Sequence, residues 1–218
     1  MLNFYLAKMK KTVSQKQYVF ISHAGYRQNE YLLILNPHEE LRRKIMAVKD
    51  EFNKTFNAPT ARWGKPHLGI VRFKQLEMME ERIIHNLKVI AMGFHPIKVE
   101  LKDFGSYPSH TIFINVTTKE PIKKLVKEIK PWQKLLKLNE DNKPHFIDDP
   151  MITVARQLKP WQYESAWKEY EHKNFTGRFI ADGMLLLKRG VGETGYQIAS
   201  RFDFQNLPVS TKQGSLFG

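Results

Sequence analysis

Apolar and polar residues recur along the chain at two different spacings, which predicts both helices and strands. In the segment after Pro37, Leu41, Ile45 and Phe52 recur at the spacing of one helical face. The segment that begins at Ile97 alternates apolar and polar residues instead, as a half-buried strand does. Applied to the whole chain, these patterns predict strands over 30–36, 67–73, 97–105, 110–117, 151–158, 177–190 and 196–204, and helices over 38–56, 75–92, 121–138 and 159–175. Pro131 predicts a kink or break in the third helix.

The succession of these elements repeats along the chain. Each half gives strands and helices in a similar order and ends in a pair of strands. Such a repeat predicts an α+β fold with two lobes related by a pseudo-twofold axis, in which antiparallel sheets flanked by helices surround a central groove. Residues 67–73 and 151–158 are the equivalent strands of the two halves, and we expect them to face each other across that groove.

Composition divides the chain into three regions. Residues 1–29 are polar and basic with little periodicity, which predicts an N-terminal basic arm. The periodic segments all fall within 30–204, which we expect to form the bilobal domain. Residues 205–218 have the composition of a flexible C-terminal tail.

The charge of the chain favours an anionic partner. Its 35 Lys and Arg residues against 22 Asp and Glu give a formal net charge of +13 and a pI near 9.8. A basic protein of this kind is expected to meet nucleic acid, nucleotides or phosphates. The chain has no cysteine, which excludes disulfides, thiolate metal sites and cysteine nucleophiles. No stretch approaches the roughly 18 apolar residues needed to span a bilayer, so we expect no membrane partner and a cytoplasmic location.

Two short segments look like copies of one strand. KPHLGIVRF (65–73) carries Pro66 and His67, and PMITVARQ (150–157) carries Thr153 and Arg156. These residues resemble the H-x-T motifs of the two-histidine (2H) phosphoesterase superfamily, which includes the 2′-5′ RNA ligase-like proteins. The resemblance covers roughly residues 30–204. The chain departs from the doubled motif twice, because Gly69 stands at the first threonine position and Met151 at the second histidine position.

The resemblance implies a metal-independent and cofactor-independent phosphoesterase acting on RNA ends or nucleotides. In that chemistry one imidazole takes a proton from the attacking water and the other gives one to the leaving oxygen, while the threonine hydroxyls hold the phosphate. Here His67 and Thr153 are the candidate catalytic residues. Candidate substrate-binding residues are Gly69, Met151, Arg156, Arg72 and His145.

Each candidate residue also has a purely structural interpretation. His67 could be a packed strand histidine, Arg72 and Arg156 could form an exposed basic rim, and Met151 could fill space in a repacked groove. His145, in KPHFIDDP, could replace the missing histidine or be a solvated loop residue. The departures at positions 69 and 151 leave two functions open. One is a catalytically impaired phosphodiesterase, and the other is a non-catalytic nucleotide- or RNA-binding protein.

The C-terminal tail suggests a third function. QGSLF (213–217) resembles the short peptide by which bacterial replication and repair proteins dock into the sliding clamp. Gln213, Leu216 and Phe217 are the candidate partner-binding residues, because an extended tail can bury two large apolar side chains in a partner's pocket. Glycine replaces the usual leucine after the glutamine. The alternatives are a tail that packs on its own domain or one that has no partner.

Overall fold

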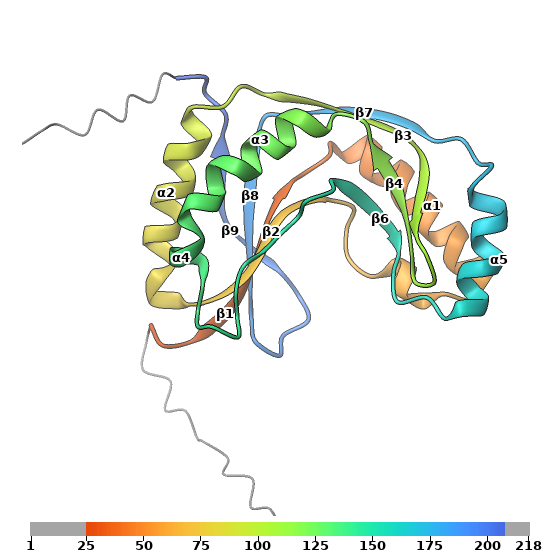
Figure 1. Ribbon diagram of the computed structural model, residues 1–218, viewed down its shortest axis with the longest axis horizontal. Coiled ribbons are helices and arrows are strands. Elements are labelled where there is room, and N and C mark those ends of the chain that lie inside the picture. The colour runs from red at the N-terminus through yellow and green to blue at the C-terminus, as the bar shows by residue number, and fades with distance from the viewer. Residues whose placement is uncertain (1–24, 208–218) are drawn as a thin grey trace, which may run out of the picture.

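Two antiparallel sheets form the framework of the protein. In the computed structural model, which describes residues 25–207, sheet A has the strand order β5-β2-β1-β8-β9 and sheet B the order β6-β4-β3-β7. Figure 1 shows the sheets as the two arms of an arch, with β2 and β6 on its inner side. The strands are β1 (Gln28–Leu35), β2 (Leu68–Leu76), β3 (Ile97–Tyr107), β4 (Thr111–Val116), β5 (His145–Phe146), β6 (Met151–Ala155), β7 (Thr176–Ala181), β8 (Gly183–Gly190) and β9 (Gln197–Asp203).

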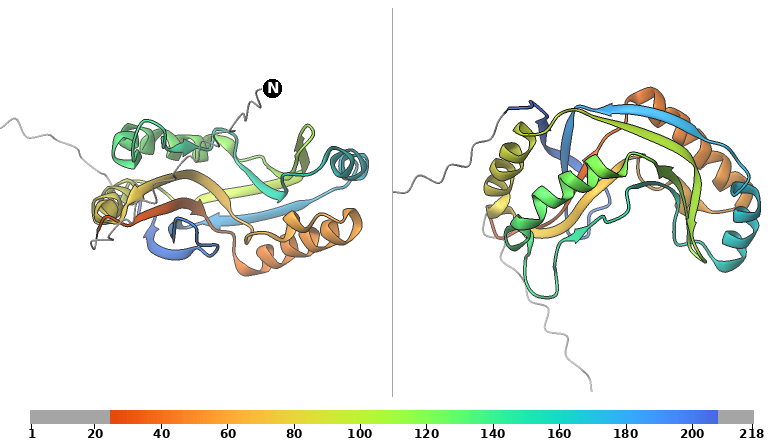
Figure 2. Two further views of the ribbon diagram at one scale, coloured as in Figure 1. Left: turned by 90° about the horizontal axis from the view of Figure 1, so that it is seen from below. Right: turned by 45° about the horizontal axis from the view of Figure 1, so that its top comes forward.

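Helices cover the outer side of both sheets. α1 contacts β6 and β7 of sheet B and packs beside α5, whereas α2 contacts β9 and α3 contacts β2, both in sheet A. Figure 2 shows α1 and α3 toward opposite ends of the molecule. The α-helices are α1 (Glu39–Phe56), α2 (Glu80–Met92), α3 (Lys119–Ile129), α4 (Gln133–Leu136) and α5 (Pro160–Tyr170), and the 3₁₀-helices are η1 (Pro59–Arg62), η2 (Glu77–Met79) and η3 (Lys130–Trp132).

The two halves of the chain exchange elements. α1 follows β1 of sheet A but packs on sheet B, and α3 follows β4 of sheet B but packs on sheet A. Each lobe therefore contains segments from both halves, which element order alone could not reveal. The exchange gives both sheets one shared core, because the buried apolar side chains form one continuous cluster that includes Tyr31 of sheet A and Ile114 of sheet B.

The α+β class and the types of the predicted elements are confirmed, but several boundaries differ. The last helix ends at Tyr170 and not at 175, and the short strand β5 was not predicted. The segment 177–190 is not one strand, because β7 pairs with β3 in sheet B and β8 pairs with β1 in sheet A. The second helix begins later than predicted, at Glu80. The Gln75 side chain donates to the carbonyls of Leu135 and Lys137, at 2.9 and 3.0 Å, and so fixes the end of β2. The break predicted at Pro131 is confirmed, because the third helix stops at Ile129 and the chain continues as η3 and α4.

Local sequence explains how α1 begins. His38 is the N-cap, and its Nδ1 accepts a hydrogen bond from the Leu41 backbone N–H at 3.3 Å. Glu39 and Glu40 lie in the first turn, where carboxylates favour the positive end of the helix dipole. The helix carries its buried face, with Leu41, Ile45 and Phe52, across the outer side of sheet B.

No helix within residues 25–207 is both long enough and apolar enough to cross a membrane. The cytoplasmic location stays a prediction. The boundaries of the three predicted regions also stay predictions. The first strand begins at Gln28, two residues before the start predicted for the domain.

Candidate functional site

The two motif strands share one backbone irregularity. On β2, Leu33 pairs with Val71 and Ile34 pairs with Gly69, which leaves Ile70 as one extra residue. On β6, Ile112 pairs with Ala155 and Phe113 pairs with Thr153, which leaves Val154 extra. These are two β-bulges at equivalent positions of the repeat, one residue after Gly69 and one residue after Thr153.

The bulges change which side chains share a face. Normal alternation would place residues 69 and 72 on opposite faces of a strand, but one extra residue returns them to the same face. On β2, Leu68, Ile70 and Val71 are buried, whereas Gly69 is half-buried and Arg72 is exposed. The β6 segment repeats this pattern, with Thr153 half-buried and Arg156 exposed.

We call the six side-chain positions of this arrangement the inner face. β2 and β6 are in contact, and the Arg156 charge acts on the His67 imidazole, so both strands contribute to one site. In each segment an arginine follows three residues after the second motif position: Arg72 in β2 and Arg156 directly after the end of β6. The inner face comprises His67, Gly69, Arg72, Met151, Thr153 and Arg156.

His67 is held by a backbone hydrogen bond just before β2. Its Nδ1 lies 2.8 Å from the carbonyl oxygen of Lys65. Because a carbonyl only accepts, Nδ1 carries the proton, and Nε2 of the neutral ring is left with its lone pair. Burial lowers the pKa of His67, the charges of Lys49 and Arg156 lower it further, and the Lys65 hydrogen bond opposes them. The neutral ring can therefore accept a proton through Nε2.

Lys49 supports the loop that precedes His67, and the sequence analysis missed it. Its side chain is only 3% exposed, and Nζ donates to the carbonyls of Trp63 and Gly64 at 3.1 and 2.9 Å. Burial lowers the pKa of Lys49 to about 8, the charge of Arg156 acts in the same direction, and Asp50 opposes them. One signal was present in the sequence, because Lys49 lies four residues after Ile45 on the buried face of α1.

Thr153 and Arg156 offer hydrogen-bond donors that are not otherwise engaged. Within residues 25–207, the Thr153 hydroxyl makes no hydrogen bond with another protein group and Arg156 makes no ion pair. A hydroxyl and a guanidinium can donate several hydrogen bonds to the oxygens of one phosphate. This half of the inner face therefore suits an anion.

The two departures from the motif have different surroundings. A Cβ atom at Gly69 would lie 3.4 Å from Cγ1 of Ile147, so Ile147 occupies the space beside this position. Met151 is half-buried on β6, where it pairs with Asn115 of β4. A thioether has no exchangeable proton, and glycine has no side-chain donor. The inner face thus holds one acid–base group and one hydroxyl.

His145 lies on sheet A and not on the strand of Met151. It forms the short strand β5 with Phe146 and pairs with Arg72 of β2. Ile147, the residue after Phe146, also lies beside β2, because its N–H donates to the Ile70 carbonyl at 2.9 Å. This position makes His145 a neighbour of Arg72. Its predicted role as a ligand-binding residue stays a prediction.

Two other predictions concern partners and metals. Gln213, Leu216 and Phe217 of the clamp-like peptide lie outside the described residues. Within residues 25–207, no group of three or more His, Asp or Glu side chains is placed to hold a metal ion.

The fold and the inner face define a class of protein: a two-lobed α+β protein whose equivalent segments carry histidine, threonine and arginine at matching positions. Comparison with known proteins agrees with this class. The chain matches the family model of the 2′-5′ RNA ligase superfamily over residues 35–193, and it therefore belongs to that superfamily. The predicted resemblance to 2H phosphoesterases is confirmed. Among curated proteins, none matches this sequence.

Solved structures with the same fold are similar in shape and distant in sequence. The protein TT0787 of Thermus thermophilus has a TM-score of 0.58 and 12% identity, covering 81% of this chain and 98% of that one. Escherichia coli LigT complexed with 3′-AMP has a TM-score of 0.54 and 13% identity, covering 82% and 98%. LigT complexed with ATP has a TM-score of 0.52 and 12% identity, with the same coverage. At this identity the similarity shows the fold alone.

Proposed function

We propose that this chain binds the phosphate of a nucleotide or an RNA end on its inner face and lacks the paired-histidine catalysis of its superfamily. The observation that carries the proposal is the pair of equivalent bulges. They place Arg72 and Arg156 on the same face as His67 and Thr153, while Met151 occupies the position of the second proton-transfer group.

The proposed phosphate contacts come from both strands. Thr153 and Arg156 donate hydrogen bonds to the non-bridging oxygens, and Arg156 also supplies positive charge. His67, whose Nε2 carries the lone pair, acts as the single acid–base residue of the face. Arg72 and His145 belong to the ligand-binding surface further along β2, where they pair in register.

The missing half of the motif explains why turnover is lost. Opening a cyclic phosphate needs one group to take a proton and another to give one. Met151 cannot exchange a proton, and no hydroxyl is available at Gly69 to stabilise the second phosphate oxygen. Losing one acid–base group costs on the order of 10²- to 10⁴-fold in rate. Phosphate binding does not need the second proton transfer, so binding survives the change.

Two further findings support the proposal. The net charge of +13 favours an anionic ligand. The LigT structures were solved with 3′-AMP and with ATP, which are phosphate-bearing ligands of a protein with the same fold.

Calorimetry with 3′-AMP and with a 2′,3′-cyclic nucleotide tests the proposal. We expect binding without conversion of the cyclic phosphate, and affinity that falls as salt is added. Arg156→Ala should weaken binding by about 10- to 100-fold, because a charge-assisted hydrogen bond is lost. The matched control is Arg43→Ala, which removes an exposed arginine from α1 and should leave binding unchanged. Wild-type protein that binds neither nucleotide would contradict the proposal.

A second proposed role belongs to the C-terminal tail and rests on the sequence QGSLF alone. In this proposal, Gln213, Leu216 and Phe217 dock the chain to a bacterial sliding clamp. Deletion of 213–218 should abolish binding to purified clamp and leave nucleotide binding intact. Leu216→Ala with Phe217→Ala should have the same effect as the deletion. Clamp binding that persists in both variants would exclude the role.

A further inference from the structure

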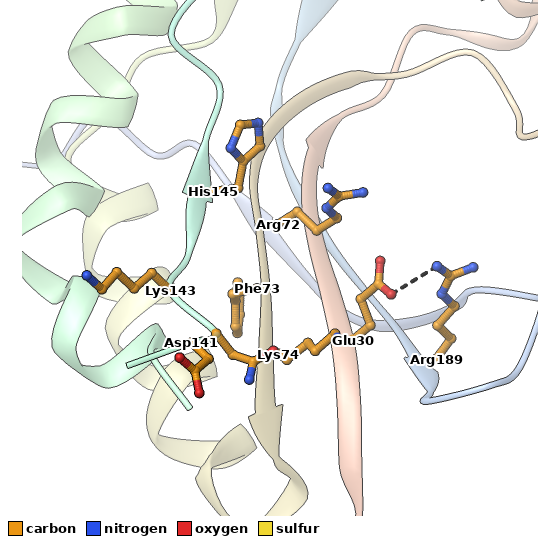
Figure 3. Close-up of a pocket in the computed structure, with 9 residues that line it drawn as sticks. Glu30, Arg72, Phe73, Lys74, Asp141, Lys143, His145 and Arg189 are labelled. Atoms are coloured by element: carbon orange, nitrogen blue, oxygen red, sulfur yellow. Dashed lines mark hydrogen bonds and ion pairs between the residues drawn. The ribbon is translucent and has the colours of Figure 1, made fainter. Parts of the chain in front are cut away.

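We infer that a second anion-binding pocket, built on sheet A beside the inner face, accepts another phosphate of the same strand, so that the ligand is a single-stranded oligonucleotide end. This inference rests on the proposed function. The pocket has a volume of about 360 Å³, within the range of small-ligand sites. Figure 3 shows its ionisable lining residues: Glu30, Arg72, Lys74, Asp141, Lys143, His145 and Arg189.

Strand register explains why these side chains meet. His145 of β5 pairs with Arg72 of β2. Two residues along, Lys74 of β2 pairs with Glu30 of β1, and Glu30 pairs in turn with Arg189 of β8. Residues directly opposite in antiparallel strands have their Cβ atoms about 5 Å apart. Two neighbouring sets of cross-strand pairs thus place these ionisable side chains close together on sheet A.

The pocket carries an excess of positive charge. Its carboxylates are Glu30 and Asp141, against two arginines and two lysines. Glu30 is already engaged, since it accepts hydrogen bonds from Arg189 Nη2 at 2.9 Å and from the Tyr196 hydroxyl at 2.6 Å. Within the described part of the chain, Arg72 and Lys74 make no ion pair. These two cations therefore line the pocket without forming an ion pair, although the charge of Arg72 contributes to lowering the pKa of Glu30.

The loop at the pocket rim is held in place by its own hydrogen bonds. Asn139 Oδ1 accepts from the backbone N–H groups of Asp141 and Asn142, at 3.1 and 2.9 Å, and from the Asn142 side chain. At the start of the loop, Gln75 of β2 donates to the Lys137 carbonyl. Lys143 and His145 thus line the pocket from an ordered loop, and Lys143 Nζ lies 3.9 Å from Glu140 Oε2. An ordered loop reduces the entropy lost when a ligand binds.

The pocket and the inner face share Arg72, which lines the pocket and belongs to the inner face. The bulge at Ile70 places Gly69, Arg72 and Lys74 on one face of β2, so a ligand can follow this strand from the first site to the second. Because the bulge at Ile70 adds one residue without a full step, the strand advances roughly 7 Å from Gly69 to Arg72 and roughly 13 Å to Lys74. One phosphate group cannot span that distance, whereas successive phosphates of an extended strand can. A single strand with a terminal phosphate matches both positions.

The test compares a 3′-phosphorylated mononucleotide with a 3′-phosphorylated RNA tetranucleotide. The variant is Lys74→Ala with Lys143→Ala, which removes two pocket charges and leaves the inner face untouched. The matched control is Lys54→Ala with Lys168→Ala, two exposed lysines on α1 and α5, which cover sheet B. ATP serves as a third ligand, because it carries several phosphates without a second nucleotide.

Wild-type protein should bind the tetranucleotide more tightly than the mononucleotide. The pocket variant should lose roughly tenfold in tetranucleotide affinity and reduce the salt slope by about 0.7 for each phosphate contact removed. It should bind the mononucleotide and ATP as wild type does, and the control variant should match wild type throughout. An unchanged affinity ratio in the pocket variant would overturn the inference. If the pocket variant lost as much affinity for ATP as for the tetranucleotide, the pocket would be a polyphosphate site, and the inference would also be overturned.

The two proposals fail in different ways. If the mononucleotide binds but the tetranucleotide gains nothing over it, only the second pocket is wrong. If wild-type protein binds no phosphate-bearing ligand, the proposed function is wrong and the pocket inference fails with it.

Discussion

The β2 and β6 segments have equivalent backbones and different chemistry. Each has a bulge one residue after the second motif position, and each then presents an arginine on the inner face. The β2 segment keeps His67 and has Gly69, whereas the β6 segment has Met151 and keeps Thr153. Backbone geometry that positions a ligand can therefore persist where the residues for proton transfer do not, because the bulge depends on strand pairing and not on those side chains.

The comparison predicts its largest effect when the two segments are made alike. Met151→His with Gly69→Thr completes both motifs, and we expect cyclic phosphodiesterase activity to rise by about 10²- to 10⁴-fold over wild type. The measurement is hydrolysis of a 2′,3′-cyclic nucleotide. Adding His67→Ala to the restored protein should remove the gain, because the second proton-transfer group is lost again.

Ile147 provides a second version of this experiment. The new threonine side chain would contact Ile147, which lies 3.4 Å from the Cβ position at Gly69. The same pair of substitutions is therefore also made with Ile147→Ala, which opens space for the hydroxyl. If both variants bind nucleotide but do not hydrolyse the cyclic phosphate, the inner face differs from an active site by more than its two missing residues.

The second prediction concerns Lys49, which has no counterpart in the paired segments. Its folded-state pKa of about 8 lies below the ordinary lysine value of 10.5. Between these values the unfolded chain binds more protons, so the free energy of unfolding should rise with pH from 8 to 10.5, by up to about 3 kcal/mol. Urea unfolding of wild type and Lys49→Met across this range measures the effect. If the free energy of unfolding changed with pH equally in wild type and Lys49→Met, the prediction would be contradicted.

A third prediction concerns the pH dependence of binding, to which His67 contributes and its counterpart Met151, which does not titrate, cannot. Burial and neighbouring cations lower the pKa of free His67, and a bound phosphate should raise it again. Binding then takes up a proton, so affinity should increase as pH falls, by up to tenfold for each unit by which the pKa rises. Calorimetric titration of 3′-AMP at several pH values tests this. His67→Gln should give a flatter dependence, while His85→Gln, on α2, should behave like wild type.

The smallest predicted effect distinguishes the two arginines. Arg156 lowers the pKa of His67, whereas Arg72 is not among its causes. NMR titration should therefore show the His67 pKa closer to its ordinary value in Arg156→Ala and unchanged in Arg72→Ala. Equal shifts in the two variants would mean that both arginines lie equally near His67.

The candidate site was only partly predictable from the sequence. The paired segments identified His67, Thr153 and Arg156, because their residue types and spacing survive in the linear chain. Lys49 was missed, since a lysine on a helix is normally exposed and only packing against the Trp63–Gly64 carbonyls buries it. The pairing of His145 with Arg72 was also hidden, because it depends on a loop that returns to the edge of sheet A.

The element types, the internal repeat and the superfamily could all be read from the linear chain, because periodicity and motif spacing are local properties. The exchange of α1 and α3 between the sheets, the two equivalent bulges and the basic pocket on sheet A became visible only in three dimensions. These features depend on strand register and on burial between residues far apart in the sequence. Long-range pairing sets both, and the linear pattern of the chain does not record it.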